Sequence, residues 1–531
     1  MDEMSPPTPA TDRLLHQDPV IHRRRWFLLA VMCLSLVMVV MSVAGLNVAL
    51  PSMQRELDAS ASDLQWIVDV YALVFAALLL PAGAIADRFG RKGTFLVGLA
   101  IFAAGSVVGG IGTGATQIIV GRVINGIGAA FVMPATLSLI ATVFPPAERR
   151  RAIAVWAGFA GAGGALGPMV SGALLENFWW GSALLVNVPI VALVATAVWL
   201  FSPTSRDPAA TPLDPVGAVL SLIGLGALIF GIIEGPERGW TDSTVLAAFA
   251  AAAVGLGSFV AWERRSPHPM LPLGLFGDRR MSVGSGVVTV AFFIMFGFFF
   301  LFTLYLQFVR RYSPLNAGMA TLPMAMTLVA VAPRSAAVAE RVGTGRVMAL
   351  SFLLVASGFT VLSQIDPRTP YPVLVCALVL MGAGMSLTAA PATGSIMSAV
   401  PHAKAGVGSA VNDTTREVGG ALGIAVLGSI GSAAYRSAVD LDGLSLPPDV
   451  RRAAAESVGA ATVIADRLPG GAELAARAGE AFTHAFNVAT GVAAALALVT
   501  AAVVYSAFSR RVEEAADGVT QPAAPSADRA A

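Results

Sequence analysis

The sequence contains fourteen apolar stretches, most of them close to 20 residues long, separated mainly by short polar connections. A helix of roughly 20 apolar residues is long enough to cross the hydrocarbon core of a bilayer. Hydrophobic residues make up 56% of the chain and charged residues only 13%, against about 25% charged residues in soluble domains. The chain is therefore predicted to be an all-α polytopic membrane protein. The expected spans are 26–50, 64–86, 94–113, 117–142, 152–175, 183–202, 215–234, 244–262, 282–308, 316–339, 346–364, 371–398, 405–432 and 482–508.

Basic residues in the connections gather on one side of the predicted membrane. Cytoplasmic loops are enriched in Lys and Arg, so this side is predicted to be the cytoplasm, with both termini inside. The excess of Arg, Ala and Gly is typical of a GC-rich bacterial genome, which favours a bacterial plasma membrane. The clusters are Arg23 to Arg25, Arg88 with Arg91 and Lys92, Arg149 to Arg151, Arg264 with Arg265, Arg279 with Arg280, Arg341 with Arg346, and Arg510 with Arg511.

Three short matches indicate that the chain is internally duplicated. The acid, the base and the glycine of Gly83 to Lys92 recur at the same spacing in Ala336 to Gly343, 253 residues later. The segment 163–167 recurs letter for letter as 419–423, an offset of 256, and 134–136 recurs as 391–393, an offset of 257. Matches in one order at nearly one offset favour a repeat of six helices, as in transporters built from two halves.

The repeat divides the chain into two bundles with helices 7 and 8 between them. Both tails are rich in Pro, Ala and charge, so they are expected to be disordered. A long connection between helices 13 and 14 is expected to form a small amphipathic cap outside the membrane. The predicted domains are a cytoplasmic tail 1–25, an N-terminal six-helix bundle 26–202, a linker 203–281 with helices 7 and 8, a C-terminal six-helix bundle 282–508 with an external loop 433–481, and a tail 509–531.

The first copy of the repeated hinge places an acid at the end of helix 2 and bases at the start of helix 3. Asp87 and the bases Arg88, Arg91 and Lys92 can therefore latch two cytoplasmic helix ends together, in a contact that can open. The second copy keeps Glu340 and Arg341 but has Thr344 where Arg91 stands, so it has fewer basic partners. The alternative is a topology signal alone, because clustered bases hold a loop inside without a partner. The candidate latch residues are Gly83, Asp87, Arg88, Gly90, Arg91, Lys92, Glu340 and Arg341.

Ionisable residues inside apolar spans are functional candidates, because burying a charge in a membrane is expensive. Asp69 and Arg122 each lie about six residues inside the outer end of their helix, at ~9 Å depth from the rise per residue. Equal depth allows them to face one cavity and pair, which would offset part of their desolvation. A buried pair with a structural role is the alternative.

Helix 13 carries the densest set of charges inside a predicted span. Asp413 and Glu417 lie one turn apart on one face, and Arg416 lies three residues from Asp413. These residues are candidates for binding protons or the charge of a substrate. Alternatively, Arg416 neutralises both acids and the cluster is purely structural.

Helix 5 and helix 9 carry marked apolar patterns. Gly163 and Gly167 stand four residues apart, which permits close helix packing, and Pro168 removes a backbone hydrogen bond and bends the helix. The phenylalanines of helix 9 cover every face, so most of them are expected to contact lipid. They are Phe292, Phe293, Phe296 and Phe298 to Phe300.

Several of these segments match motifs of a known family. They are Gly83-x-x-Ala-Asp87-Arg88-x-Gly90-Arg91-Lys92, Gly121-Arg122-x-x-x-Gly126-x-Gly128, Gly163-x-x-x-Gly167-Pro168 with Ser171-Gly172, Asn47-Val-Ala-Leu-Pro51, Asn187-Val-Pro189 and Glu234-Gly-Pro236. Residues 26–508 thereby resemble the major facilitator superfamily, and within it the fourteen-helix drug:proton antiporters of the EmrB/QacA type. The resemblance implies the major facilitator fold, two six-helix bundles plus two additional helices. It also implies an antiporter motif at Gly163, Gly167, Pro168 and Gly172, and a cavity rim that includes Asn47 and Glu234.

The sequence departs from this family at two positions. Ser171 replaces a usual glycine, and Ser42 stands where helix 1 usually carries an aspartate. Without that aspartate, either Asp69 takes the proton or coupling relies on the second half, where Asp413 and Glu417 fall on carboxylates of the family.

The resemblance implies a proton-coupled antiporter that exports amphipathic drug-like or antibiotic compounds by alternating access. A carboxylate in a dry cavity suits this role, because burial disfavours its charged form and allows protonation near neutral pH. A dedicated exporter of an endogenous metabolite, such as a self-made antibiotic, is one alternative. A non-transporting membrane scaffold or receptor is another.

Other function classes have little support. Neither Lys92 nor Lys404 is followed by Ser or Thr, so the chain has no phosphate-binding loop of an ATP-driven pump. It also lacks the HExxH, CxxC and GxSxG patterns of enzymes, and a formal net charge of +1 gives no sign of nucleic-acid binding. We therefore expect a monomer that is not an enzyme and needs no cofactor, driven by the proton gradient. Its expected partners are protons, a small amphipathic substrate and membrane lipid.

Overall fold

The computed structural model describes residues 18–57, 61–204, 213–401, 404–444, 446–468 and 471–520, which form helices and no strand. The first half contains α1 (Pro19–Ala44), α2 (Leu46–Leu57), α3 (Ala61–Phe89), α4 (Arg91–Gly110), α5 (Ala115–Val143), α6 (Pro146–Leu175), α7 (Ser182–Leu185) and α8 (Asn187–Phe201). A hairpin of α9 (Pro215–Arg238) and α10 (Ser243–Glu263) follows, then the short 3-10 helix η2 (Leu273–Gly277). The second half contains α11 (Arg279–Leu304), the π-helix η3 (Tyr305–Val309), α12 (Pro314–Ala320), α13 (Leu322–Val342), α14 (Thr344–Leu362), α15 (Tyr371–Ser398), α16 (Ala405–Ala438), α17 (Pro448–Glu456), α18 (Val458–Arg467) and α19 (Ala472–Thr520).

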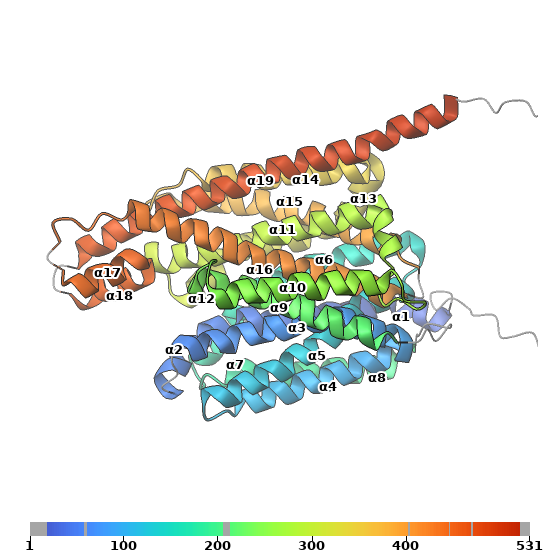
Figure 1. The fold of residues 1–531 in the computed structure, drawn as a ribbon, viewed down its shortest axis with the longest axis horizontal. Coiled ribbons are helices and arrows are strands. Elements are labelled where there is room, and N and C mark those ends of the chain that lie inside the picture. Colours follow the sequence, from blue (N-terminus) through green and yellow to red (C-terminus); the bar gives the residue numbers. More distant parts are fainter. Residues whose placement is uncertain are drawn as a thin grey trace, which may run out of the picture.

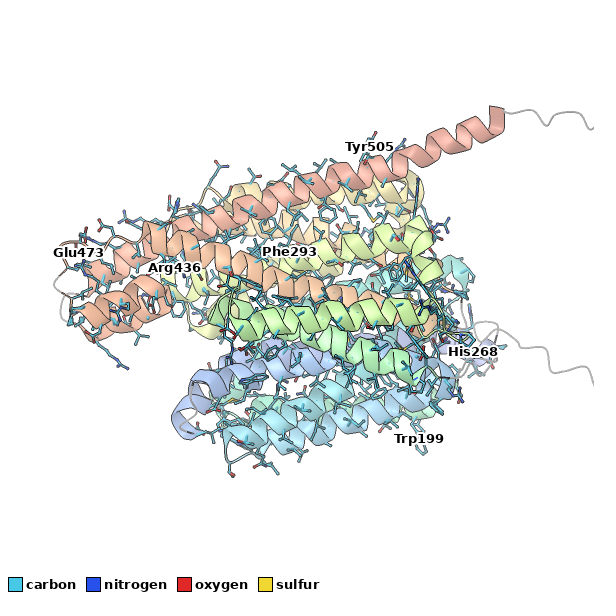
Figure 2. All side chains as sticks on the ribbon, in the orientation of Figure 1. Trp199, His268, Phe293, Arg436, Glu473 and Tyr505 are labelled. Carbon is cyan, nitrogen blue, oxygen red and sulfur yellow. The ribbon has the colours of Figure 1, made fainter. Side chains whose placement is uncertain are left out.

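The predicted membrane spans correspond to long helices. Within the described residues, thirteen helical segments are long and apolar enough to cross a membrane. The predicted fifth span corresponds to α6, a continuous helix of 30 residues. The long helices run side by side, and large apolar side chains such as Trp199, which is 68% exposed, cover the outside of the bundle (Figures 1 and 2). Exposed apolar side chains of this kind suit contact with lipid.

Several helix ends differ from the prediction. The tail expected at 1–25 is helical from Pro19 on, because Asp18 caps the helix by accepting hydrogen bonds from Val20 N (2.8 Å) and Ile21 N (3.3 Å). Residues 1–17 lie outside the described part of the chain. At the other end, α19 continues to Thr520, past the predicted boundary at 508.

The connection predicted at 433–481 is shorter than expected, and it contains two short helices. α16 extends to Ala438, α19 begins at Ala472, and α17 and α18 lie between them. Tyr435 Oη donates a hydrogen bond to Ala454 O (2.8 Å), which ties α16 to α17. These two short helices lie at the end of the bundle opposite to the start of α1 (Figure 1).

The internal duplication is visible in the backbone. Gly90 (φ 108°, ψ 128°) and Gly343 (φ 96°, ψ 137°) are the N-caps of α4 and α14 and share a conformation that favours glycine. The repeated glycine segments also lie at equivalent close approaches between two helices. A Cβ added to Gly167 would lie 2.8 Å from Gly45 N, between α6 and α1, and one added to Gly297 would lie 2.6 Å from Gly423 O, between α11 and α16.

Two of the helix pairs that join the halves are related to each other by the repeat: α3 packs against α16, and α6 packs against α13. Further contacts join α5 to α16 and α6 to α15, and α9 of the additional hairpin contacts both α3 and α16. One apolar core lies mainly in the first half and another mainly in the second, and each includes a few residues of the other half.

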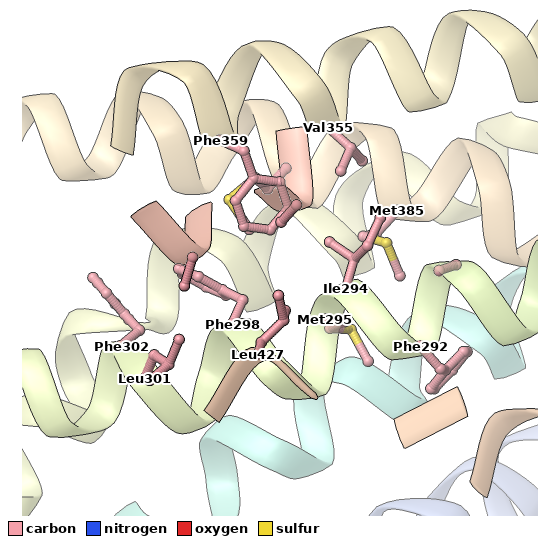
Figure 3. Close-up of a cluster of buried hydrophobic side chains, with 14 of the residues drawn as sticks. Phe292, Ile294, Met295, Phe298, Leu301, Phe302, Val355, Phe359, Met385 and Leu427 are labelled. Carbon is pink, nitrogen blue, oxygen red and sulfur yellow. The ribbon is translucent and has the colours of Figure 1, made fainter. Parts of the chain in front are cut away.

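The aromatic run of α11 lies mostly inside the second half. Phe298 is 1% exposed and stacks on Phe302 with ring centroids 4.9 Å apart (Figure 3). Phe292 is also buried, whereas Phe300 is 41% exposed. The prediction that most of these rings contact lipid is wrong for Phe292 and Phe298, because a run that covers every face of a helix also covers the face that packs on α14 and α16.

Candidate functional site

The Asp87 carboxylate joins the end of α3 to the start of α16. The turn at Gly90 brings Arg91 back onto Asp87, and Arg91 Nε and Nη2 donate hydrogen bonds to Oδ1 at 3.0 and 2.8 Å. Across the interface, Gly406 N donates to Oδ1 (2.9 Å) and Val407 N donates to Oδ2 (3.1 Å). Arg91, one of the three candidate bases of the latch, thus pairs with Asp87. The Asp87 carboxylate also caps the N-terminus of α16 in the other half, where a negative charge is favourable.

Close approach of two glycines makes this contact geometrically possible. A Cβ added to Gly83 would lie 2.7 Å from both Ala410 Cβ and Gly406 O. A Cβ added to Gly406 would lie 2.7 Å from Asp87 Oδ1. Any larger residue at either position would hold the two helices apart and keep Asp87 from the helix end.

The other basic residues of the hinge have different contacts. Lys92 Nζ donates hydrogen bonds to Trp199 O and Ser202 O, both at 2.8 Å, and so caps the end of α8. The Arg88 guanidinium lies 5.7 Å from the centroid of the Phe89 ring.

The second copy of the hinge also reaches across the interface. Arg150 Nη1, at the start of α6, lies 3.5 Å from Glu340 Oε1, at the end of α13. Arg150 stands 256 residues before Gly406, so the two contacts occupy equivalent positions of the repeat. The second contact is exposed, with side-chain exposures of 65% and 53%, and Arg341 beside it is exposed as well. We call the end of the bundle that holds Asp87, Arg150 and Glu340 the latch end.

A further ion pair lies at the latch end within the first half. Arg25 Nε of α1 lies 2.6 Å from Glu148 Oε2 of α6, and Arg25 Nη2 donates to Oε1 at 3.0 Å. The hydrogen bond from Arg25 lowers the pKa of the Glu148 carboxyl from its ordinary value. This pair joins two helices of the same half and does not cross to the other half.

The predicted pairing of Asp69 with Arg122 is not formed by hydrogen bonds. Arg122 is fully buried, its Nε donates to Ile67 O (3.0 Å), and its guanidinium lies 4.3 Å from the centroid of the Tyr71 ring. Its Nη1 and Nη2 make no hydrogen bond within the described residues. Asp69 instead lines a small cavity between α3 and α9 with Trp66, Leu73, Phe230, Ile233 and Glu234.

The acids of helix 13 lie inside the span α16, and Asp413 faces a dense polar network. Asp413 is 1% exposed, and its Oδ1 accepts from Arg416 Nη1 (3.4 Å) and Asn412 Nδ2 (3.2 Å). Its Oδ2 makes no hydrogen bond in the described part of the chain. Glu417 directly follows Arg416 and lies one turn from Asp413 on the same face of α16.

The Arg416 guanidinium lies between two aromatic rings from opposite halves. Its central carbon is 4.5 Å from the centroid of Phe292 in α11 and 5.4 Å from that of Trp156 in α6. Trp156 is 1% exposed and its Nε1 donates to Thr136 Oγ1 (3.1 Å). Arg416 therefore contacts both halves through this pair of rings.

The other candidate residues lie at packing positions or in a local ion pair. Gly163 packs on Val40, Gly172 lies near Leu315 of α12, and Pro168 stands inside α6. Glu234 is buried and forms an ion pair with Arg238. The side chain of Asn47 lies outside the described part of the structure.

Sequence reasoning gave no role to Trp156, which stands in an apolar helix with no pattern that distinguishes it from a core residue. Phe292 belongs to the aromatic run that was expected mostly to contact lipid, so its contact with Arg416 was not predicted. Arg150 was interpreted as part of a topology cluster, although the repeat offset of 256 from position 406 could have placed it at the interface.

The family model that matches the chain is the Major Facilitator Superfamily, over residues 32–424. The chain belongs to this superfamily. Among its relatives, the multidrug efflux pump LfrA of Mycolicibacterium smegmatis is 36% identical over 92% of this chain and 97% of the relative. The tetracenomycin C resistance and export protein of Streptomyces glaucescens is 33% identical over 92% of each chain. The methyl viologen resistance protein SmvA of Salmonella typhimurium is 31% identical over 90% of this chain and 97% of the relative.

Solved structures of the superfamily share the fold. The human organic anion transporter MFSD10 superposes with a TM-score of 0.60 at 14% identity, covering 90% of this chain and 99% of MFSD10. The proton:xylose symporter XylE superposes with a TM-score of 0.56 at 13% identity, covering 90% of this chain and 95% of XylE. The predicted major facilitator fold and the interpretation as a transporter fold, not an enzyme, are confirmed.

Proposed function

We propose that this protein exports small amphipathic drug-like or antibiotic compounds across the bacterial plasma membrane in exchange for protons, by alternating access. The observation that carries the proposal is Asp413, a buried carboxylate inside a membrane span whose network reaches both halves of the molecule. Ionisable groups at such positions mark proton and substrate pathways. The names of the relatives support export of drugs and antibiotics, since they include a multidrug efflux pump and a tetracenomycin C export protein.

The latch end supplies one gate of the alternating-access cycle. We place it in the cytoplasm with both termini, following the excess of Arg and Lys in the connections. With Asp87 on the start of α16 and Glu340 on Arg150, the halves are held together on that side. Opening toward the cytoplasm requires both contacts to separate, and conformations of a protein of this kind differ by a few kcal/mol.

We place the proton at Asp413 and Glu417, not at Asp69. Asp413 and Glu417 flank Arg416, which contacts rings of both halves, so a change in their charge alters contacts across the interface. Asp69 faces α9 of the additional hairpin, and the predicted partner Arg122 donates elsewhere. Protonation of either acid would release Arg416 from part of its attraction and let the halves rearrange. The protein would act as a monomer, without a cofactor.

Transport by purified protein tests this function. In proteoliposomes with an imposed pH gradient, we expect uphill movement of a fluorescent cation such as ethidium, which a protonophore abolishes. No gradient-dependent movement of any probe in a panel of antibiotics and dyes would instead favour a scaffold or receptor that keeps the fold.

A dedicated exporter of one antibiotic is the second candidate. It is favoured by the 33% identity over 92% of the chain with an export protein named for tetracenomycin C. Substrate range separates the two: the proposed function predicts transport of chemically unrelated amphipathic compounds, whereas a dedicated exporter moves one compound class.

A further inference from the structure

We propose that Arg416 is a built-in cation that occupies the binding site of a cationic substrate, so that the substrate binds by displacing its guanidinium. This inference rests on the proposed export function and names the chemistry that controls which substrates enter. The site consists of Trp156, Phe292 and Asp413, and we call it the cation box.

The cation box has the composition that organic cations prefer. Cations are attracted to aromatic rings within about 6 Å of the centroid, and both rings meet this distance to the Arg416 guanidinium, at 4.5 and 5.4 Å. Asp413 supplies the opposite charge, 3.4 Å from Nη1. The box draws Trp156 from the first half and the other two residues from the second half, so a bound cation would contact both.

The walls of the box are held by contacts that do not involve Arg416. Trp156 Nε1 donates to Thr136 Oγ1 (3.1 Å), and Phe292 packs against Phe296 with centroids 5.8 Å apart. Asp413 accepts from Asn412 Nδ2 (3.2 Å), and Asn412 is itself held by Thr393. Removal of the guanidinium would therefore leave a preformed site of two rings and a carboxylate.

The bond between Arg416 and the box is weak enough to exchange. Charge-assisted hydrogen bonds are usually about 2.7–2.9 Å long, and the one from Arg416 to Asp413 measures 3.4 Å. For comparison, Arg91 makes two bonds to Asp87 at 2.8 and 3.0 Å. Asp413 Oδ2 makes no hydrogen bond within the described residues, so an acceptor is ready for an incoming donor.

Release of the Arg416 guanidinium from the box is a local step. Arg416 and Asp413 are three residues apart on α16, so the arginine leaves by changing its side-chain rotamer. Glu417 is the neighbouring residue. Its carboxylate can attract the positive charge of the displaced Arg416 guanidinium. A cationic substrate can replace the contacts that Arg416 makes with the two rings and the carboxylate. A neutral substrate cannot replace these contacts.

Equilibrium binding to purified protein in detergent, without a pH gradient, tests the inference. The probes are tetraphenylphosphonium as a monocation and N-phenyl-1-naphthylamine as a neutral apolar dye. We expect Arg416→Gln to raise the affinity for tetraphenylphosphonium by roughly tenfold, equivalent to about 1.4 kcal/mol, and to leave the neutral dye within about twofold. Arg416→Lys keeps the competing charge and should remain near the wild type.

Substitution of Phe292 or Trp156 should reverse the gain in cation affinity. Adding Phe292→Leu or Trp156→Leu to Arg416→Gln should lower cation affinity again, because the ring faces are lost. If Arg416→Gln does not fold, the double variant Arg416→Gln with Glu417→Gln keeps the charge balance and the box, and should show the same gain. Unchanged or lower cation affinity in a folded Arg416→Gln protein, or in that double variant, would overturn the inference.

The binding result is separable from the proposed function. Binding without a gradient tests the cation box alone. If Arg416→Gln leaves cation affinity unchanged, proton-driven export in proteoliposomes can still occur. Conversely, if Arg416→Gln raises cation affinity but no gradient-driven transport is seen, the proposed proton coupling is overturned and the inference about the cation box stands.

Discussion

At the scale of single residues, the two copies of the hinge differ in burial more than in chemistry. Asp87 is 5% exposed and accepts four hydrogen bonds, two of them from backbone groups of the other half. Glu340 makes one exposed ion pair. Hydrogen bonds to a charged group contribute about 1.5–3 kcal/mol, whereas exposed ion pairs contribute about 0.2–1 kcal/mol. The first latch should therefore dominate closure.

We expect Asp87→Asn to slow transport by about tenfold or more while the yield of folded protein changes little. The substitution removes the charge that binds the start of α16 and the Arg91 guanidinium, which costs about 1.5–3 kcal/mol of closure. Dye transport in proteoliposomes and the monodisperse fraction in size-exclusion chromatography measure the two effects. Asp278→Asn is the matched control, because Asp278 caps its own helix α11. Equal loss of transport and yield would instead indicate a folding role.

Glu340→Gln should have the same effect in a weaker form, less than about fivefold on transport. Its partner Arg150 is 65% exposed, so solvent already screens the pair. A double-mutant cycle with Arg150→Gln measures the coupling. Strictly additive effects of the two changes would show that this contact does not act in closure.

The wrong prediction that Asp69 pairs with Arg122 shows what the depth of a residue in the membrane does not determine. Asp69 and Arg122 do lie in neighbouring helices, but Arg122 contacts Ile67 and Tyr71 of α3. Asp69 is two positions away from both, which is about 200° around a helix, so it faces α9. Depth follows from counting residues, whereas the direction around a helix depends on packing that no local pattern records. The carboxylate of Asp87 was predictable, but its backbone partners have no sequence signature.

At the scale of helices, the crossing of α3 and α16 depends on glycine. Fourteen spans could be predicted from length and hydropathy alone. Their ends could not, because α1 starts where Asp18 caps it and α16 and α19 continue beyond the apolar run. The glycine crossing could not be predicted either, since Gly406 is one of many glycines in an Ala- and Gly-rich chain.

Gly83→Ala should weaken closure of the latch end, because its Cβ would lie 2.7 Å from Ala410 Cβ and Gly406 O. Overpacking of this kind costs about 1–3 kcal/mol. We expect transport to fall by about fivefold or more. Gly93→Ala is the control, because no atom lies within 4 Å of its added Cβ. Equal transport by Gly83→Ala and Gly93→Ala would show that transport does not depend on the close approach of α3 and α16.

At the scale of the whole molecule, the duplication predicts that the halves move as bodies. Two interface pairs, α3 with α16 and α6 with α13, are related by the repeat, and the two apolar cores lie mainly in one half each. The repeat in the sequence was enough to predict two six-helix halves. How they face each other required the structure, because the contacts between halves involve small residues and backbone groups.

A reversible cross-link between Arg150→Cys and Glu340→Cys should block transport, and reduction of a cleavable linker should restore it. The background needs Cys33→Ala and Cys376→Ala, which remove both native cysteines. Arg25→Cys with Glu148→Cys is the matched control at the same end, since that pair lies within one half. Full transport by the cross-linked 150–340 variant would mean that the latch end does not open.

The most direct test of the account is uphill export driven by a pH gradient, compared among three carboxylate variants in proteoliposomes. Asp413→Asn and Glu417→Gln should insert and fold but lose at least about 90% of uphill ethidium transport, since each removes a group that we propose to exchange protons. Asp69→Asn should keep most of it. Loss of uphill transport in Asp69→Asn, with full transport in both helix 13 variants, would contradict the assignment of proton coupling to Asp413 and Glu417.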